Sequence, residues 1–185
     1  MKKVLVSILL FAAVMAFASP AMAQGKGFTI GLGLGLGHQV FSPDEGRSES
    51  ENGLAGPTLK IGGFLQPNLA ILFKATGTVT FPDTNNDRTD ATISHYLLGP
   101  AVQFWPTDAI FLEAGLGYSR VTLTIEGDGF KVSDTDTGAG VMGALGYAFW
   151  RQGPHALGVS LELAAGNHDA VTVYSAGVAF NWQYM

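Results

Sequence analysis

The sequence contains no cysteine among its 185 residues, and only 14% of its residues are charged. The absence of cysteine excludes a disulfide framework, a thiolate metal site and a lipid-modified cysteine. The charged fraction is well below the roughly 25% usual for a soluble domain. The formal net charge of -5 argues against a nucleic-acid partner, which would need a basic face. After residue 23, no apolar run approaches the ~20 residues that a membrane-spanning helix requires.

The start of the chain has the pattern of a secretory signal peptide. Two lysines precede an apolar run at residues 4–17, and Ala21-Met22-Ala23 fits a small-x-small cleavage site. The apolar run is too short for the main alternative, a transmembrane anchor. We therefore predict a cleaved signal peptide over residues 1–23 and one exported domain over residues 24–185.

What the chain does have is alternation. Glycine alternates with leucine or isoleucine from Ile30 to Gly37, which suits a strand with one apolar and one bare face, because successive strand side chains point to opposite faces. Similar alternation predicts eight strands, at residues 28–40, 54–65, 69–81, 93–105, 109–123, 137–150, 156–164 and 171–184. The alternation blurs near Arg120 and Val121, a pattern compatible with a β-bulge.

The connections between these segments alternate between short and long. Three tight turns are predicted at residues 66–68, 106–108 and 151–155, and four polar loops at 42–52, 82–90, 126–136 and 166–169. An even number of strands places both chain ends on the side of the turns. This is the layout of a transmembrane barrel in a bacterial outer membrane, with short periplasmic turns and outer loops.

The composition of the two strand faces indicates which one meets lipid. The second face carries mostly glycine, alanine, serine and threonine, which suits the narrow filled lumen of an eight-stranded barrel. A soluble lipocalin-like carrier would instead place many charges on that face. Aromatic side chains form two bands on the apolar face, as in membrane barrels. The turn-side band is Phe104, Tyr147, Phe149, Phe180, Trp182 and Tyr184, and the loop-side band is Phe81, Tyr96, Tyr118 and Tyr174.

With these features, the chain resembles the small eight-stranded outer-membrane barrels: the OmpA transmembrane domain, OmpX and opacity-type proteins. The resemblance implies an all-β, antiparallel up-and-down transmembrane β-barrel in the bacterial outer membrane. It also implies contact with outer-membrane lipid and lipopolysaccharide, handling by the barrel-assembly machinery, and a monomer. The family's C-terminal assembly signal matches Ser175, Gly177, Phe180 and Trp182, although the tail 183–185 departs from the terminal aromatic of many members.

Four charges fall on the lumen face of the predicted strands: Lys60, Lys74, Glu113 and Glu162. Each lies a few residues from a predicted periplasmic turn, so all four are expected at similar depth. Buried charges are normally paired, because unpaired ones are costly. We expect an ion-pair network that plugs the lumen. The resemblance to OmpA-type barrels adds a second interpretation, the gate of a small pore.

Other candidate chemistry is weak. Asp83, Asn85 and Asp87 have the spacing of a calcium loop's start, but Arg88 replaces the required glycine, so we predict a solvated acidic loop. Ser94 and His95 are adjacent, and neighbours on a strand point to opposite faces. We predict no catalytic residues, no metal site and no cofactor.

The sequence therefore predicts a structural or surface-interaction role in the cell envelope. Three alternatives stay open: a small gated pore for ions or solutes, a lipid A-modifying enzyme, and a periplasmic lipocalin-like carrier.

Overall fold

The structure, a computed structural model, describes residues 27–43, 46, 48–82, 89–169 and 171–185. They form eight β-strands, whose bounds are β1 Gly27–Pro43, β2 Glu49–Gln66, β3 Leu69–Thr80, β4 Thr89–Phe104, β5 Ile110–Gly127, β6 Phe130–Gln152, β7 His155–Asn167 and β8 Val171–Tyr184. Each strand pairs antiparallel with the next, and β1 pairs with β8, so the sheet closes into a barrel. The predicted all-β up-and-down barrel is confirmed.

Some predictions fall outside the described residues. The signal peptide at residues 1–23 and the acidic loop residues Asp83, Asn85 and Asp87 lie there, so both stay predictions. Within the described part of the chain, no helix is both long and apolar enough to cross a membrane.

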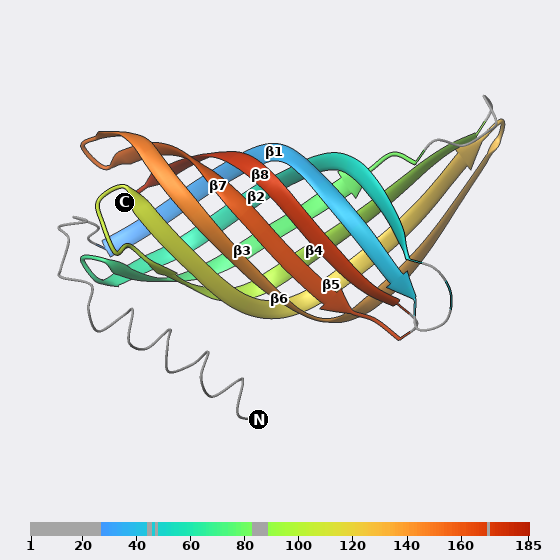
Figure 1. Cartoon of the computed structure of the whole chain (residues 1–185), viewed down its shortest axis with the longest axis horizontal. Helices are drawn as coiled ribbons and strands as arrows, with labels where there is room; N and C mark the ends of the chain where they lie inside the picture. The colour runs from blue at the N-terminus through green and yellow to red at the C-terminus, as the bar shows by residue number, and fades with distance from the viewer. Residues whose placement is uncertain (1–26, 44–45, 47, 83–88, 170) are drawn as a thin grey trace.

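The two ends of the barrel differ in length and shape (Figure 1). The C-terminus lies at the end that carries the tight turns after β2, β4 and β6. At the opposite end, β4, β5 and β6 extend well beyond the other strands. The turns and loops thus lie on opposite sides, as the alternation predicted.

The wall of the barrel faces outward with apolar side chains. The exposed large residues include Leu32, Leu34 and Leu36 of β1 and Leu161 and Leu163 of β7. A continuous apolar outer wall of this kind is typical of a barrel whose outer face meets lipid. Most aromatic side chains of both predicted bands are exposed here: Phe81, Tyr96, Tyr118, Tyr147, Phe149, Tyr174, Phe180 and Tyr184.

One aromatic residue departs from the predicted turn-side band. Phe104 is only 6% exposed. It is the last residue of β4, directly before Trp105, whose ring packs inside the barrel with Phe111 and Ala156. Phe104 still pairs with Leu69 and Leu112 in the sheet, so alternation alone does not account for its burial.

The predicted third loop at 126–136 is wrong. Residues 110–127 pair with 147–130 in one continuous register, and only Asp128 and Gly129 connect β5 to β6. Gly129 has a φ of +81°, which glycine adopts readily in such two-residue hairpin turns. The same continuous register passes Arg120 and Val121, so the bulge considered there is absent.

Candidate functional site in the barrel lumen

The register of β2 and β3 sets two lysines side by side inside the barrel. Lys60 and Lys74 are directly opposite each other on the two strands, and each is 1% exposed. Like charges at directly opposed positions repel, and burial removes the water that would screen them. The pair therefore needs counter-charges from elsewhere in the lumen.

Glu113 of β5 supplies the first counter-charge from across the lumen. Its Oε1 accepts a hydrogen bond from Lys60 Nζ at 2.6 Å, and its Oε2 accepts one from Lys74 Nζ at 2.7 Å. The amide of Gln103, the neighbour of Glu113 on β4, donates to the same Oε1 at 2.8 Å. The Glu113 carboxylate thus joins β5 to β2, β3 and β4. Its hydrogen bonds are charge-assisted and therefore stronger than those between neutral groups.

Glu162 of β7 supplies the second counter-charge. Its Oε2 lies 3.5 Å from Lys74 Nζ and accepts hydrogen bonds from Thr76 at 2.8 Å and Thr58 at 3.1 Å. The four charges that the sequence placed on the lumen face are therefore brought together, two positive and two negative. We call Lys60, Lys74, Glu113 and Glu162 the lumen charge cluster.

Below the lumen charge cluster, toward the turns, the lumen is filled by polar and then apolar side chains. Gln103 exchanges hydrogen bonds with Gln183, and Trp105 Nε1 donates to Gln103 at 3.0 Å. An apolar group then closes this end: Trp105, Phe111, Ala144, Ala148, Ala156 and Met185. Lys60 Nζ lies 4.8 Å above the Phe111 ring, so the charged and apolar layers are in direct contact.

Above the lumen charge cluster, the free space is small. A cavity of about 20 Å³ touches Thr76, His95 and Glu162, which is room for about one water molecule. Among the described residues, buried side chains occupy the lumen on both sides of this cavity.

A second polar cluster, which sequence reasoning missed, lies toward the loop end. His95 Nδ1 is 2.8 Å from Ser175 Oγ, and His95 Nε2 is 3.0 Å from Ser119 Oγ, which is also 3.1 Å from His168 Nε2. All four residues are buried. The lumen-face alternation of β4, β5 and β8 could have indicated that these side chains converge, but only the closed topology brings the strands together. Ser94, on the other face of β4, takes no part in this cluster.

The residues of the predicted assembly signal divide between the two faces of β8. Ser175 lies in the lumen against His95. Phe180 packs against Phe149, with ring centroids 5.9 Å apart, and Trp182 stacks on His155 at 5.8 Å. Their recognition by the assembly machinery stays a prediction.

The arrangement supports packing and closure more readily than catalysis. The lumen charge cluster is neutral as a whole and buried. Among the described residues, the side-chain hydrogen-bond partners of His95 are serine hydroxyls, not a carboxylate that would orient the ring as in a nucleophile–base–acid arrangement. Among the described residues, no group of three histidine, aspartate or glutamate side chains is placed to hold a metal ion.

Comparisons with known proteins agree with this architecture. A family model described as an outer membrane protein beta-barrel domain matches residues 9–183. Among solved structures, Ail, the attachment invasion locus protein of Yersinia pestis, matches with a TM-score of 0.63 and 13% identity, covering 86% of this chain and 99% of Ail. Neisserial surface protein A matches with a TM-score of 0.57 and 17% identity, covering 86% and 97%. At these identities the likeness shows the fold alone.

A search of curated proteins finds no match to the sequence. The family match covers nearly the whole chain, the solved neighbours are small barrels of the same kind, and the outer wall of the barrel exposes large apolar side chains. The chain therefore belongs to the outer-membrane protein β-barrel domain family and is located in the bacterial outer membrane.

Proposed function

We propose that this protein is a closed structural barrel that makes surface contacts outside the cell through the extended ends of β4, β5 and β6. We call residues 90–93, 120–127 and 130–137 the projecting sheet. The observation that carries the proposal is the length of this sheet. Beyond Tyr118 and Ala139, nine further residue pairs join β5 to β6, which is about 30 Å of strand at ~3.3 Å per residue.

The projecting sheet has one polar and one apolar face. On the polar face, Thr122 and Thr135 are 3.1 Å apart, and Thr124 and Ser133 are 3.0 Å apart. The apolar face continues the lumen side of the strands and carries Ile93, Val121, Leu123, Ile125, Phe130 and Val132. Asp134 and Asp136 lie on the same face, opposite Leu123 and Val121. Phe130 is 51% and Val132 60% exposed. An exposed apolar patch rimmed by polar residues is typical of an interaction site.

The edge of the projecting sheet supports the same proposal. Strand β7 pairs with β6 only from Ala139 onward, opposite Asn167, so among the described residues no strand covers the far edge of residues 130–138. An uncovered edge offers backbone donors and acceptors to an extended peptide. Asp134 and Asp136 on this edge disfavour pairing with a second copy of the same acidic strand.

Charge indicates the kind of partner. The projecting sheet carries four acidic side chains, Asp90, Glu126, Asp134 and Asp136, and two basic ones, Arg120 and Lys131. Ail has also been solved with the heparin analogue sucrose octasulfate, but an acidic sheet does not complement a polyanion. The proposed partner here is an extended polypeptide with apolar and basic side chains.

A peptide array probed with the barrel in lipid nanodiscs tests this proposal. We expect binding to apolar-basic peptides, and loss of binding when the apolar face is changed by Phe130→Thr with Val132→Thr. The matched control changes the polar face of the same strands, Thr124→Ala with Ser133→Ala, and should bind as the wild type does. Binding no better than that of empty nanodiscs, or equal loss in both variants, would contradict the proposal.

The second candidate function is a gated pore, and the composition of the lumen charge cluster favours it. Lys74 Nζ lies within 3.5 Å of both Glu113 and Glu162, so a single ammonium group has two carboxylates between which it can exchange. Such an exchange would open space beside the small cavity above the cluster. Planar-bilayer recordings separate the candidates: a pore requires openings in the wild type and a changed conductance in Glu162→Gln.

A further inference from the structure

The two buried histidines toward the loop end of the lumen share one hydroxyl group. His95 Nε2 of β4 and His168 Nε2, just after β7, lie 3.0 and 3.1 Å from Ser119 Oγ of β5. Their ring centroids are 6.1 Å apart, and the two residues are 0% and 5% exposed. Two imidazole nitrogens and one hydroxyl oxygen, carried by three separate segments of the chain, therefore converge inside the barrel.

Gly166 of β7 keeps the place where these three atoms meet free of a side chain. A Cβ at this position would lie 2.1 Å from Ser119 Oγ, 2.8 Å from His95 Nε2 and 2.9 Å from His168 Nε2. Any residue larger than glycine would therefore push the two rings and the hydroxyl apart.

Hydrogen bonds satisfy this group of atoms only in part. A neutral imidazole has one donor and one acceptor nitrogen, and a serine hydroxyl has a single proton to donate. His95 uses both nitrogens, on Ser119 and Ser175. In the part of the chain that the structure describes, His168 Nδ1 is buried without a hydrogen-bond partner. The His168 ring is therefore less firmly held than that of His95 and is available to a further ligand.

We propose that His95, His168 and Ser119 form a binding site for a divalent transition-metal ion of the Cu(II) or Ni(II) class. Imidazole nitrogen is a favoured ligand of these ions, and both accept ligands at right angles. Two such ligands, each ~2.1 Å from the ion, lie ~3.0 Å apart, against ~3.4 Å in a tetrahedral zinc site. The separations of the two Nε2 atoms from Ser119 Oγ match the right-angled arrangement.

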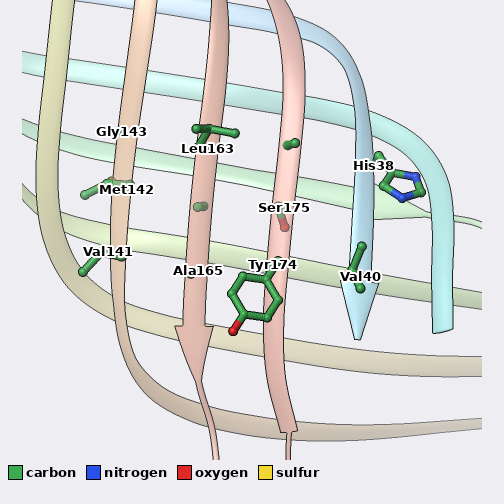
Figure 2. Close-up of a pocket in the computed structure, with 11 residues that line it drawn as sticks. His38, Val40, Val141, Met142, Gly143, Leu163, Ala165, Tyr174 and Ser175 are labelled. Atoms are coloured by element: carbon green, nitrogen blue, oxygen red, sulfur yellow. The ribbon is translucent and has the colours of Figure 1, made fainter. Parts of the chain in front are cut away.

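The surroundings of His95 orient its ring as those of a metal-binding histidine do. His95 Nδ1 lies 2.8 Å from Ser175 Oγ, so a proton on Nδ1 is donated there and the Nε2 lone pair faces Ser119. Outer hydrogen bonds of this kind fix the tautomer of ligating histidines. Figure 2 shows Ser175 beside Tyr174 on β8, next to Ala165 of β7, in the wall that encloses the site.

Space for further ligands lies on the side of the lumen charge cluster. The cavity of about 20 Å³ that touches Glu162 also touches His95 and Ser175, and it has room for about one water molecule. A water in this cavity reaches the metal side of His95. Two histidines, one hydroxyl and water thus supply the nitrogen and oxygen ligands of the proposed ion.

Isothermal titration calorimetry of the untagged barrel in mild detergent, with Cu(II) as the probe, tests the proposal. We expect one ion per barrel and at least about tenfold weaker binding in His95→Gln and in His168→Gln, because even outer partners of ligating histidines contribute about 10–100-fold. The matched control, His38→Gln with His155→Gln, removes the two other histidines of the chain and should bind as the wild type does. No binding by the wild type, or an equal loss in the control, would overturn the proposal.

A second measurement requires no change at the site itself. Electron paramagnetic resonance of Cu(II) bound to the His38→Gln, His155→Gln barrel reports how many imidazole nitrogens coordinate the ion. We expect two at neutral pH, and release of the ion at a pH of about 5, because protonated imidazole does not bind metal. A spectrum with one or no imidazole nitrogen, or a signal that acid leaves unchanged, would refute the two-histidine site.

Discussion

Glu113→Gln is the substitution that most directly perturbs the closed lumen. In the wild type, the Glu113 carboxylate accepts hydrogen bonds from Lys60, Lys74 and Gln103 at 2.6, 2.7 and 2.8 Å. Glutamine keeps the shape but removes the charge, leaving two buried ammonium groups against the single carboxylate of Glu162. Removal of one partner from a buried ion pair typically costs about 3–5 kcal/mol. We expect the free energy of unfolding to fall by about this amount.

The assay is urea unfolding of the barrel in lipid vesicles, followed by the mobility of unheated samples on SDS gels. Lys60→Met combined with Glu113→Gln restores the charge balance and should recover at least about 2 kcal/mol. The control is Glu126→Gln in the exposed Lys131–Glu126 pair, whose side chains are 65% and 53% exposed; such pairs contribute about 1 kcal/mol or less. A loss below ~1 kcal/mol in Glu113→Gln, or no recovery in the double variant, would mean that Glu113 does not stabilise the two buried lysines.

Three further substitutions test other parts of the structure. A Cβ at Gly146 would lie 2.0 Å from the Phe111 ring, so Gly146→Ala should lower the free energy of unfolding by about 1–3 kcal/mol, as overpacking does, and adding Phe111→Leu should restore it; no effect of Gly146→Ala would contradict this packing. Gly129→Ala strains a residue with a φ of +81° and should speed proteolysis within residues 120–137 without changing the heat-induced gel shift of the barrel; unchanged proteolysis would argue against the tight hairpin turn. His95→Leu leaves the Ser119 and Ser175 hydroxyls without this buried partner and should cost about 1–3 kcal/mol in the same unfolding assay, whereas a neutral result would mean that water replaces the imidazole.

The alternation of apolar and small side chains predicted most of the barrel, because a closed barrel requires this alternation along each strand. Each strand of a closed membrane barrel must present an apolar face to lipid and small side chains to the lumen, so the face of residues such as Leu32, Lys60 and Glu113 follows from parity alone. The positions of the strand ends do not follow from this alternation. The residues around Asp128-Gly129 look like a polar loop, yet Thr122, Thr124, Ser133 and Thr135 pair across the hairpin beyond the membrane, where water allows polar side chains on a strand.

The candidate site was predictable in its members but only partly in its contacts. The lumen face and the similar depth of Lys60, Lys74, Glu113 and Glu162 follow from sequence. That Glu113 bridges both lysines while Glu162 binds Thr58 and Thr76 depends on the register between strands, which small shifts at the bulge between Ala55 and Leu59 decide. The His95 cluster joins residues 24 to 80 positions apart, and a single sequence carries no signal for such pairings.

We infer that the lumen charge cluster seals the lumen and that the protein acts through its outer surface. The most direct test is single-channel recording of the wild-type barrel in planar lipid bilayers, with Glu113→Gln beside it. Because the lumen charge cluster fills the lumen, we expect no sustained openings for the wild type at either polarity. Sustained, reproducible wild-type conductance that Glu113→Gln alters would contradict it and would identify the lumen charge cluster as the gate of a pore.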